Sequence, residues 1–76
     1  MKRRRHTENG FTMTVLRDST LVSNGNRFLE LSRIGTIVPG GTIRGGVPWH
    51  VSERAGDWTA EEIDWVTKTN ANLRAK

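Results

Sequence analysis

A glycine-rich stretch of the chain has the composition of a phosphate-binding loop. Residues 38–50 read VPGGTIRGGVPWH and contain both prolines and four of the eight glycines. A nucleotide-binding Walker loop also needs a Lys, which reaches the phosphates, and a hydroxyl residue, which holds magnesium. Gly40 and Gly45 have the required spacing, but Gly46 and Val47 occupy the two positions that the Lys and the hydroxyl would need. The sequence therefore does not predict a nucleotide-binding loop.

Two interpretations of this stretch remain. Arg44-Gly45-Gly46 is one copy of the RGG tripeptide that is repeated in RNA-binding tails. Glycines also supply the φ values that bends between short strands require, and we favour this interpretation. Because Arg44 lies between two glycine pairs, we expect its side chain to point outward. It is the residue of this stretch that we expect to contact a partner.

A second candidate for binding is the basic cluster KRRRH at residues 2–6. Arginine donates forked hydrogen bonds that suit phosphates and carboxylates, so the cluster can bind nucleic acid or an acidic protein surface. Phosphate contacts would position the protein without specifying a base sequence. Apart from Met1, residues 1–10 contain no apolar side chain, and we therefore expect them to form a disordered basic arm.

No set of residues has the spacing of a catalytic or metal site. Neither His6 nor His50 can be assigned a nucleophile or a base as partner. The acidic residues Glu61, Glu62 and Asp64 are better explained as charges that stabilise the first turn of a helix. Two histidines without any cysteine do not favour structural zinc. We predict that the protein is not an enzyme and uses no cofactor or metal.

Length and charge limit the class of protein further. A chain of 76 residues forms at most one domain with a thin core. The net charge is +4, and residues 1–50 carry eight Lys or Arg against three acidic residues. Residues 51–76 carry four against five. This asymmetry predicts an acidic or polyanionic partner, while a basic tail that only keeps the protein soluble is the alternative.

The chain also lacks the sequence features of a membrane or exported protein. No apolar run is long enough to span a bilayer. The polar residues TENG follow the basic cluster at the place where a signal peptide needs an apolar segment. We therefore expect a cytoplasmic protein with no membrane partner.

Residues 11–44 have the patterns of short antiparallel strands. FTMTVLR, at residues 11–17, alternates apolar and polar side chains, which is typical of a half-buried strand. Asn24-Gly25 favours a hairpin that pairs residues 20–23 with 26–31. A helix from Asn26 to Gly35 is the competing interpretation. A second hairpin is expected around Pro39-Gly40-Gly41, with TIV and TIR as its strands.

A helix is predicted from about residue 60 to 73. Thr59 and Glu62 have the spacing of a capping box, and Trp58 and Ile63 have that of a hydrophobic staple. The apolar stripe contains Ile63, Val66 and Leu73, and Trp65 lies about 160° from Ile63 around the helix. Trp65 is thus either a contact for a partner or a side chain covered by another part of the fold.

Two resemblances accompany these features. WTAEE, at residues 58–62, resembles the opening of a Myb or SANT helix, and we attribute this to shared capping chemistry because no recognition helix follows. The basic arm, the short strands and the terminal helix together resemble small phage-encoded regulators that bind host RNA polymerase. That resemblance implies a protein that is not an enzyme and that inhibits or modifies transcription.

The sequence thus predicts an α+β fold in which a small antiparallel sheet of hairpins is covered by one C-terminal helix. A flexible basic arm (1–10) would precede a single domain (11–76). The expected function is transcription regulation through RNA polymerase, by a protein that we expect to be a monomer, and direct binding of DNA or RNA is the alternative. The residues expected to contact the partner are Lys2, Arg3, Arg4, Arg5, Arg44, Trp49 and Trp65.

Overall fold

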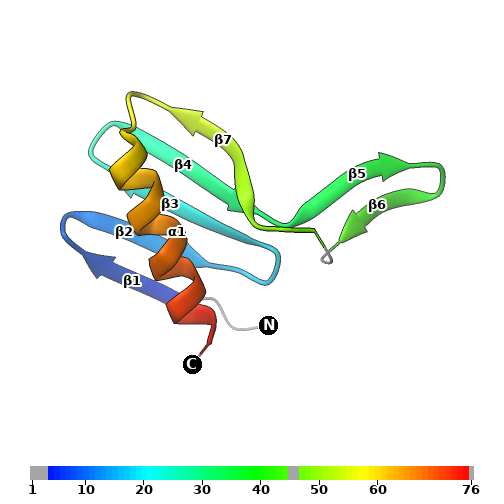
Figure 1. The fold of residues 1–76 in the computed structure, drawn as a ribbon, viewed down its shortest axis with the longest axis horizontal. Coiled ribbons are helices and arrows are strands. Elements are labelled where there is room, and N and C mark those ends of the chain that lie inside the picture. Colours follow the sequence, from blue (N-terminus) through cyan, green and yellow to red (C-terminus); the bar gives the residue numbers. More distant parts are fainter. Residues whose placement is uncertain (1–3, 45–46, 76) are drawn as a thin grey trace.

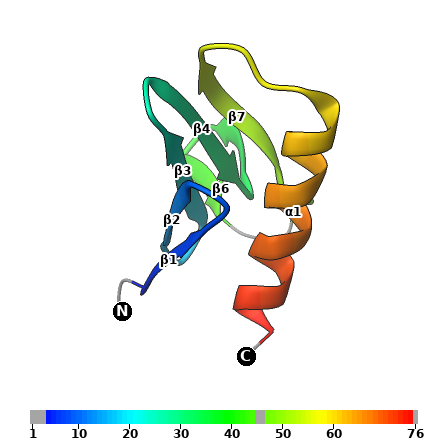
Figure 2. The ribbon, with the colours of Figure 1, turned by 90° about the vertical axis from the view of Figure 1, so that its left-hand side faces the viewer.

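The structure, a computed structural model, describes residues 4–44 and 47–75, without the side chains of residues 36–38 and 42–44. A five-stranded antiparallel sheet is covered on one face by a single helix, and a separate two-stranded ribbon extends from one end of the sheet (Figures 1 and 2). The predicted α+β fold, with an antiparallel sheet and a C-terminal helix, is confirmed.

The main sheet has the strand order β1-β2-β3-β4-β7, so its neighbours are joined by hairpins except at β7. Its strands are β1 (Arg4–Glu8), β2 (Phe11–Val15), β3 (Ser19–Asn24), β4 (Arg27–Ser32) and β7 (His50–Ala55). The separate ribbon consists of β5 (Ile34–Val38) and β6 (Gly41–Arg44), and the helix is α1 (Ala60–Arg74). In the part of the chain that the structure describes, no helix combines the length and the apolar character needed to cross a bilayer.

Strand β1 corrects the prediction of a disordered N-terminal arm. Residues 4–8 pair with β2, with Arg4 opposite Val15 and Glu8 opposite Phe11. Asn9 and Gly10 both have positive φ and form the tight turn between the two strands. Pairing satisfies backbone hydrogen-bond groups whatever the side chains are, so a polar segment can form an edge strand without an apolar face. Residues 1–3 lie outside the described residues.

Both predicted hairpins are confirmed. Asn24-Gly25 connects β3 to β4, so the alternative of a helix from Asn26 to Gly35 is wrong. Pro39-Gly40 connects β5 to β6, although this ribbon is separate from the main sheet. Strand β7 was not predicted. Its six residues are all exposed, so it has no alternating apolar pattern to indicate a strand.

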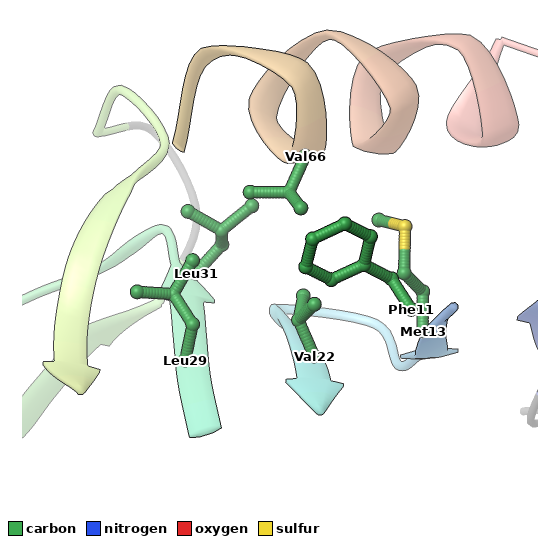
Figure 3. Packing of buried hydrophobic residues seen from close by; sticks show 6 residues of the cluster. All are labelled: Phe11, Met13, Val22, Leu29, Leu31 and Val66. Atoms are coloured by element: carbon green, nitrogen blue, oxygen red, sulfur yellow. The ribbon is translucent and has the colours of Figure 1, made fainter. Parts of the chain in front are cut away.

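The core lies between α1 and one face of the main sheet. The register places Met13 opposite Val22 and Val22 opposite Leu29, so their side chains share a face. Figure 3 shows Val66 of α1 pointing toward this layer. The buried apolar cluster consists of Phe11, Met13, Val22, Leu29, Leu31 and Val66.

The N-terminal end of α1 is fixed by the predicted capping box. The Glu62 amide donates to Thr59 Oγ1 at 3.1 Å, and the Thr59 amide donates to Glu62 Oε1 at 3.0 Å. Arg27 Nη1 of β4 donates to the same carboxylate oxygen at 2.8 Å. This bond to Arg27, together with the Thr59 amide, lowers the pKa of Glu62 to about 2. The helix is therefore joined to the sheet at the point where it begins.

Candidate functional site

The strands place arginines from distant parts of the sequence at one end of the main sheet. The start of β1, the β2–β3 turn, the end of β4 and the start of β7 all lie at this end (Figure 1). We call it the basic end, and it contains Arg4, Arg5, Arg17, Arg33 and Arg74, with Asp18 as the one carboxylate there among the described residues. Because side chains alternate along β1, Arg4 faces α1 and Arg5 lies on the opposite face of the sheet. The acidic residues Glu61 and Glu62 lie at the opposite end of α1.

Arg74, the last residue of α1, connects the helix to the basic end. Its Nη1 donates to the carbonyl of Arg17 at 3.2 Å, and its Nη2 donates to the carbonyl of Ser19 at 2.8 Å. Nη2 also donates to Thr20 Oγ1 at 2.7 Å, and Nε donates to Asn70 Oδ1 at 2.9 Å. The buried hydroxyl of Thr20 in turn donates to Asn70. These bonds hold one positive charge rigidly against the sheet.

The positive charges at this end are close enough to affect one another. Burial lowers the pKa of Arg74, and the nearby charges of Arg33 and Arg4 lower it further. Asp18 acts in the opposite direction and accepts a hydrogen bond from Arg33 Nε at 3.1 Å. Among the described residues, the carboxylate of Asp18 alone does not balance these guanidinium groups. An anion bound here would relieve their repulsion.

Trp49 lies within the basic end and is covered by arginine. The guanidinium carbon of Arg74 is 4.0 Å from the centroid of the indole ring, and that of Arg33 is 5.7 Å from it. The indole is partly buried and packs against the core. Cation–π attraction of this kind holds both guanidinium groups in place. The indole of Trp49 thus helps to position the guanidinium groups of Arg33 and Arg74.

Two other arginines at the basic end have exposed side chains. Arg5 of β1 and Arg17 of the β2–β3 turn are exposed, and neither forms an ion pair within the described part of the chain. Arg4 is also exposed, but its Nη2 donates to the carbonyl of Leu73 at 2.8 Å, near the end of α1. Arg5 and Arg17 are therefore accessible to a ligand, with Arg5 on the face of the sheet opposite α1.

The residues predicted to contact a partner are only partly brought together. Arg4, Arg5 and Trp49 lie at the basic end, whereas Lys2 and Arg3 lie outside the described residues. The backbone of Arg44 pairs with Ile34 where the ribbon leaves the domain, and its side chain is not described. Trp65 lies apart from them.

Trp65 belongs to the packing between helix and sheet. Its ring centroid lies 5.2 Å from that of Phe11, and the Phe11 ring also stacks on Trp58 at 5.8 Å. Arg27 lies over both Phe11 and Trp58, with its guanidinium carbon 4.7 Å from the Trp58 centroid. The Trp58 indole donates to the carbonyls of Phe28 and Ala55. The side chain of Trp65 is thus partly covered by Phe11, which agrees in part with the second of the two interpretations open for it.

Sequence reasoning missed three arginines of the basic end: Arg17, Arg33 and Arg74. In the sequence, Arg17 has the setting of a turn residue, and Arg74 has that of a charge near the end of a helix. Nothing in their spacing indicates that they meet, because strand register and the crossing of α1 bring them together. The charge asymmetry of the first fifty residues is a general signal, but it does not identify these positions.

Comparisons with protein-family models, with characterised proteins and with solved structures found no match for this chain. We therefore infer the function from the geometry of the basic end. Within residues 4–44 and 47–75, no three His, Asp or Glu side chains come together as metal ligands. The chemistry that the basic end offers is the binding of an anion by guanidinium groups.

Proposed function

We propose that this protein binds nucleic acid and does so without catalysing a reaction. The observation that carries the proposal is the presence of five arginines at one end of the sheet, with Arg5 on the face away from α1. Asp18 is the one carboxylate at this end among the described residues. Phosphates along a nucleic-acid strand present regularly spaced negative charges, and arginine binds them through its forked donors. The basic end would therefore contact the phosphate backbone.

The arginines of the basic end would have different roles in such a complex. Arg74 and Arg33 are held by protein partners and create a fixed positive potential. Arg5 and Arg17 are exposed and would donate directly to phosphate oxygens. A positive charge that is already held by the protein needs little rearrangement when the ligand binds.

The predicted RNA polymerase partner is the second candidate, as for the phage-encoded regulators that the chain resembles. An acidic surface of a large protein would also be attracted to the basic end. However, the directional contacts expected from Trp49 and Trp65 are weakened, because both indoles are half-buried and pack against the core. Exposed aromatic anchors are what a protein interface of this kind would need. We therefore place nucleic acid first.

The salt dependence of binding tests the proposal. The purified protein would be titrated with a fluorescently labelled duplex of about 20 base pairs at several salt concentrations between about 50 and 200 mM. Removing one phosphate contact should make the slope of log affinity against log salt shallower by about 0.9. The variant Arg5→Ala/Arg17→Ala should thus have a slope shallower by about two and should bind more weakly.

The matched control is Arg54→Ala/Lys68→Ala, which removes the same net charge from exposed positions outside the basic end. The slope of log affinity against log salt for this control should differ from the wild-type slope by only a small fraction of the change expected for Arg5→Ala/Arg17→Ala. An equal change of slope in the two double variants would mean that only the net charge matters. Absence of binding to duplex or single strand, together with retention of RNA polymerase from a lysate, would support the second candidate instead.

A further inference from the structure

The ribbon formed by β5 and β6 extends away from the basic end. The molecule measures 40 × 28 × 18 Å along its three principal axes. Figure 1 shows the ribbon projecting beyond the main sheet along the longest of these axes. The register pairs Ile37 with Thr42 and Val38 with Gly41. At the tip, Pro39, Gly40 and Gly41 are exposed. The ribbon is therefore a narrow two-stranded projection next to the proposed phosphate-binding surface.

The residue types of the ribbon differ from those of an ordinary solvent-exposed hairpin. From Arg33 to His50 the sequence contains no acidic residue, and the two strands consist mainly of Ile, Val, Thr and Gly. An isolated two-stranded hairpin is at best marginally stable in water. A projection with this composition gains stability when a partner covers it. The basic residues at its base favour a negatively charged partner.

We infer, on the basis of the proposed function, that this ribbon enters the major groove of B-form DNA. The major groove is about 12 Å wide and admits a two-stranded ribbon, whereas the minor groove is only about 6 Å wide. The major groove of A-form RNA is too narrow and deep for side chains to read. The width of the major groove therefore favours B-form DNA over double-stranded RNA as the partner of the ribbon.

The chemistry of the ribbon suits base edges in that groove. The hydroxyl group of a threonine can donate to or accept from bases, and its methyl group can contact the thymine methyl; β6 contains Thr42. The backbone of Arg44 pairs with Ile34 at the base of the ribbon, and Ile34 is the chain neighbour of Arg33 at the basic end. The phosphates that flank the groove would then lie near the basic end. Positioning by phosphates and contact with bases would come from adjacent parts of the same molecule.

Binding in the major groove of B-form DNA is tested by measuring the affinity of the wild-type protein for two duplexes of identical sequence, one of DNA and one of RNA. We expect the DNA duplex to bind at least about 10-fold more tightly at the same salt concentration. Methyl green, which occupies the major groove, should compete with the protein, and netropsin, which occupies the minor groove, should not. Equal affinity for both duplexes, or competition by netropsin alone, would overturn the inference.

The ribbon itself is tested with Pro39→Glu at the tip and Thr42→Glu in β6. Each places a negative charge on the element that would face the DNA, and each should weaken duplex binding at least about 10-fold. Ser23→Glu is the control, because Ser23 is exposed at the opposite end of the sheet. Thermal unfolding establishes that the three variants remain folded. The use of two ribbon positions guards against a local defect at either one.

The outcomes separate this inference from the proposed function. If both ribbon variants bind DNA as tightly as Ser23→Glu does, the ribbon inference fails while binding by the basic end stands. If the wild-type protein binds no nucleic acid, the proposed function fails as well. If sedimentation equilibrium without DNA shows a dimer that Pro39→Glu dissociates, the ribbon is an interface between two copies of the chain, which also overturns the inference.

Discussion

At the scale of single residues, Arg74 combines a structural and an electrostatic role. Its guanidinium group bonds to two backbone carbonyls, a threonine hydroxyl and an asparagine amide oxygen. These partners come from the β2–β3 turn, from β3 and from α1 itself. The same group carries a positive charge, and burial together with the neighbouring charges of Arg33 and Arg4 lowers its pKa. A substitution that keeps the positive charge of Arg74 but removes its forked hydrogen bonds therefore separates the structural role from the electrostatic one.

Arg74→Lys should destabilise the protein while retaining its charge. A lysine ammonium cannot reproduce the forked donors, and we expect the free energy of unfolding to fall by about 1–2 kcal/mol. Urea denaturation at neutral pH measures the change. Arg54→Lys, at an exposed position in β7, should change stability by less than about 0.5 kcal/mol. Equal stability of the two variants would contradict a structural role for Arg74.

Glu62 provides a residue-scale prediction about pH. Its pKa is lowered from 4.5 to about 2, so its carboxylate stabilises the folded state above pH 4.5 and loses this effect as the pH falls toward 2. Glu62→Gln should lower the Tm at pH 7, and the difference from wild type should disappear as the pH approaches 2. Calorimetry across this range measures it. Glu61→Gln, an exposed neighbour in the same turn, should show a smaller difference at pH 7.

At the scale of elements, the connection from β7 to α1 is set by Gly56. Its φ is +86°, and a Cβ at this position would lie 2.9 Å from Arg27 Cγ. Gly25, in the β3–β4 turn, has a φ of +63° but has open space around it. Any other residue would therefore have a strained backbone at either position. At position 56 its Cβ would also clash with the side chain of Arg27.

We expect Gly25→Ala to cost about 1 kcal/mol, from the left-handed backbone alone. Gly56→Ala should cost more, about 2–3 kcal/mol, because Arg27 must also move away from its contacts with Glu62 and Trp58. Urea denaturation of both variants compares them. If Gly56→Ala is the less destabilising of the two, Arg27 can move freely and the junction is not sterically tight.

The elements that the sequence predicted correctly each had a local signal. Asn24-Gly25 predicted the first hairpin through backbone conformation, and Thr59 with Glu62 predicted the start of α1 through side-chain capping. The edge strands β1 and β7 had no such signal. Both consist mainly of exposed residues, and what defines them is pairing with β2 and β4. Edge strands need no apolar alternation, so the pattern that predicts strands does not find them.

The positive charge of the candidate site was predictable from the sequence, but the positions that form the site were not. The excess of Lys and Arg in residues 1–50 predicted an anionic partner, but Trp65 was a candidate contact because it lies off the helical stripe. In the structure, Phe11 of β2 extends far enough to pack against it. A helical projection considers the helix alone and contains no information about the width of the layer beneath it.

At the scale of the whole molecule, charge and packing are both unevenly distributed. Arginines gather at the basic end, and the first turn of α1 carries Glu61 and Glu62. The buried cluster lies between α1 and the main sheet, and the ribbon of β5 and β6 projects away from it (Figure 1). The molecule thus consists of a packed body with a projection that depends on its own strand pairing.

Amide hydrogen exchange should reveal this division. The amides of β5 and β6 should exchange faster than those of β2, β3 and β4, because the buried cluster of the described residues lies between α1 and the main sheet. Exchange followed by NMR at neutral pH measures the rates residue by residue. Saturating DNA should slow exchange in the ribbon more than in the turn at Asn24-Gly25. Exchange at equal rates throughout the chain would mean that the ribbon unfolds only together with the body.

The hydrogen bond between Arg4 and the carbonyl of Leu73 has a consequence for the connectivity of the chain. Because β1 and the last turn of α1 touch, a short Gly/Ser linker could replace the residues before Arg4 and after Arg74 and join the two. The chain could then be reopened at Asn24-Gly25, giving a circular permutant in which each strand retains its neighbours. We expect this permutant to fold, and a far-ultraviolet circular dichroism spectrum matching the parent would show that the order of the elements along the chain does not determine the architecture.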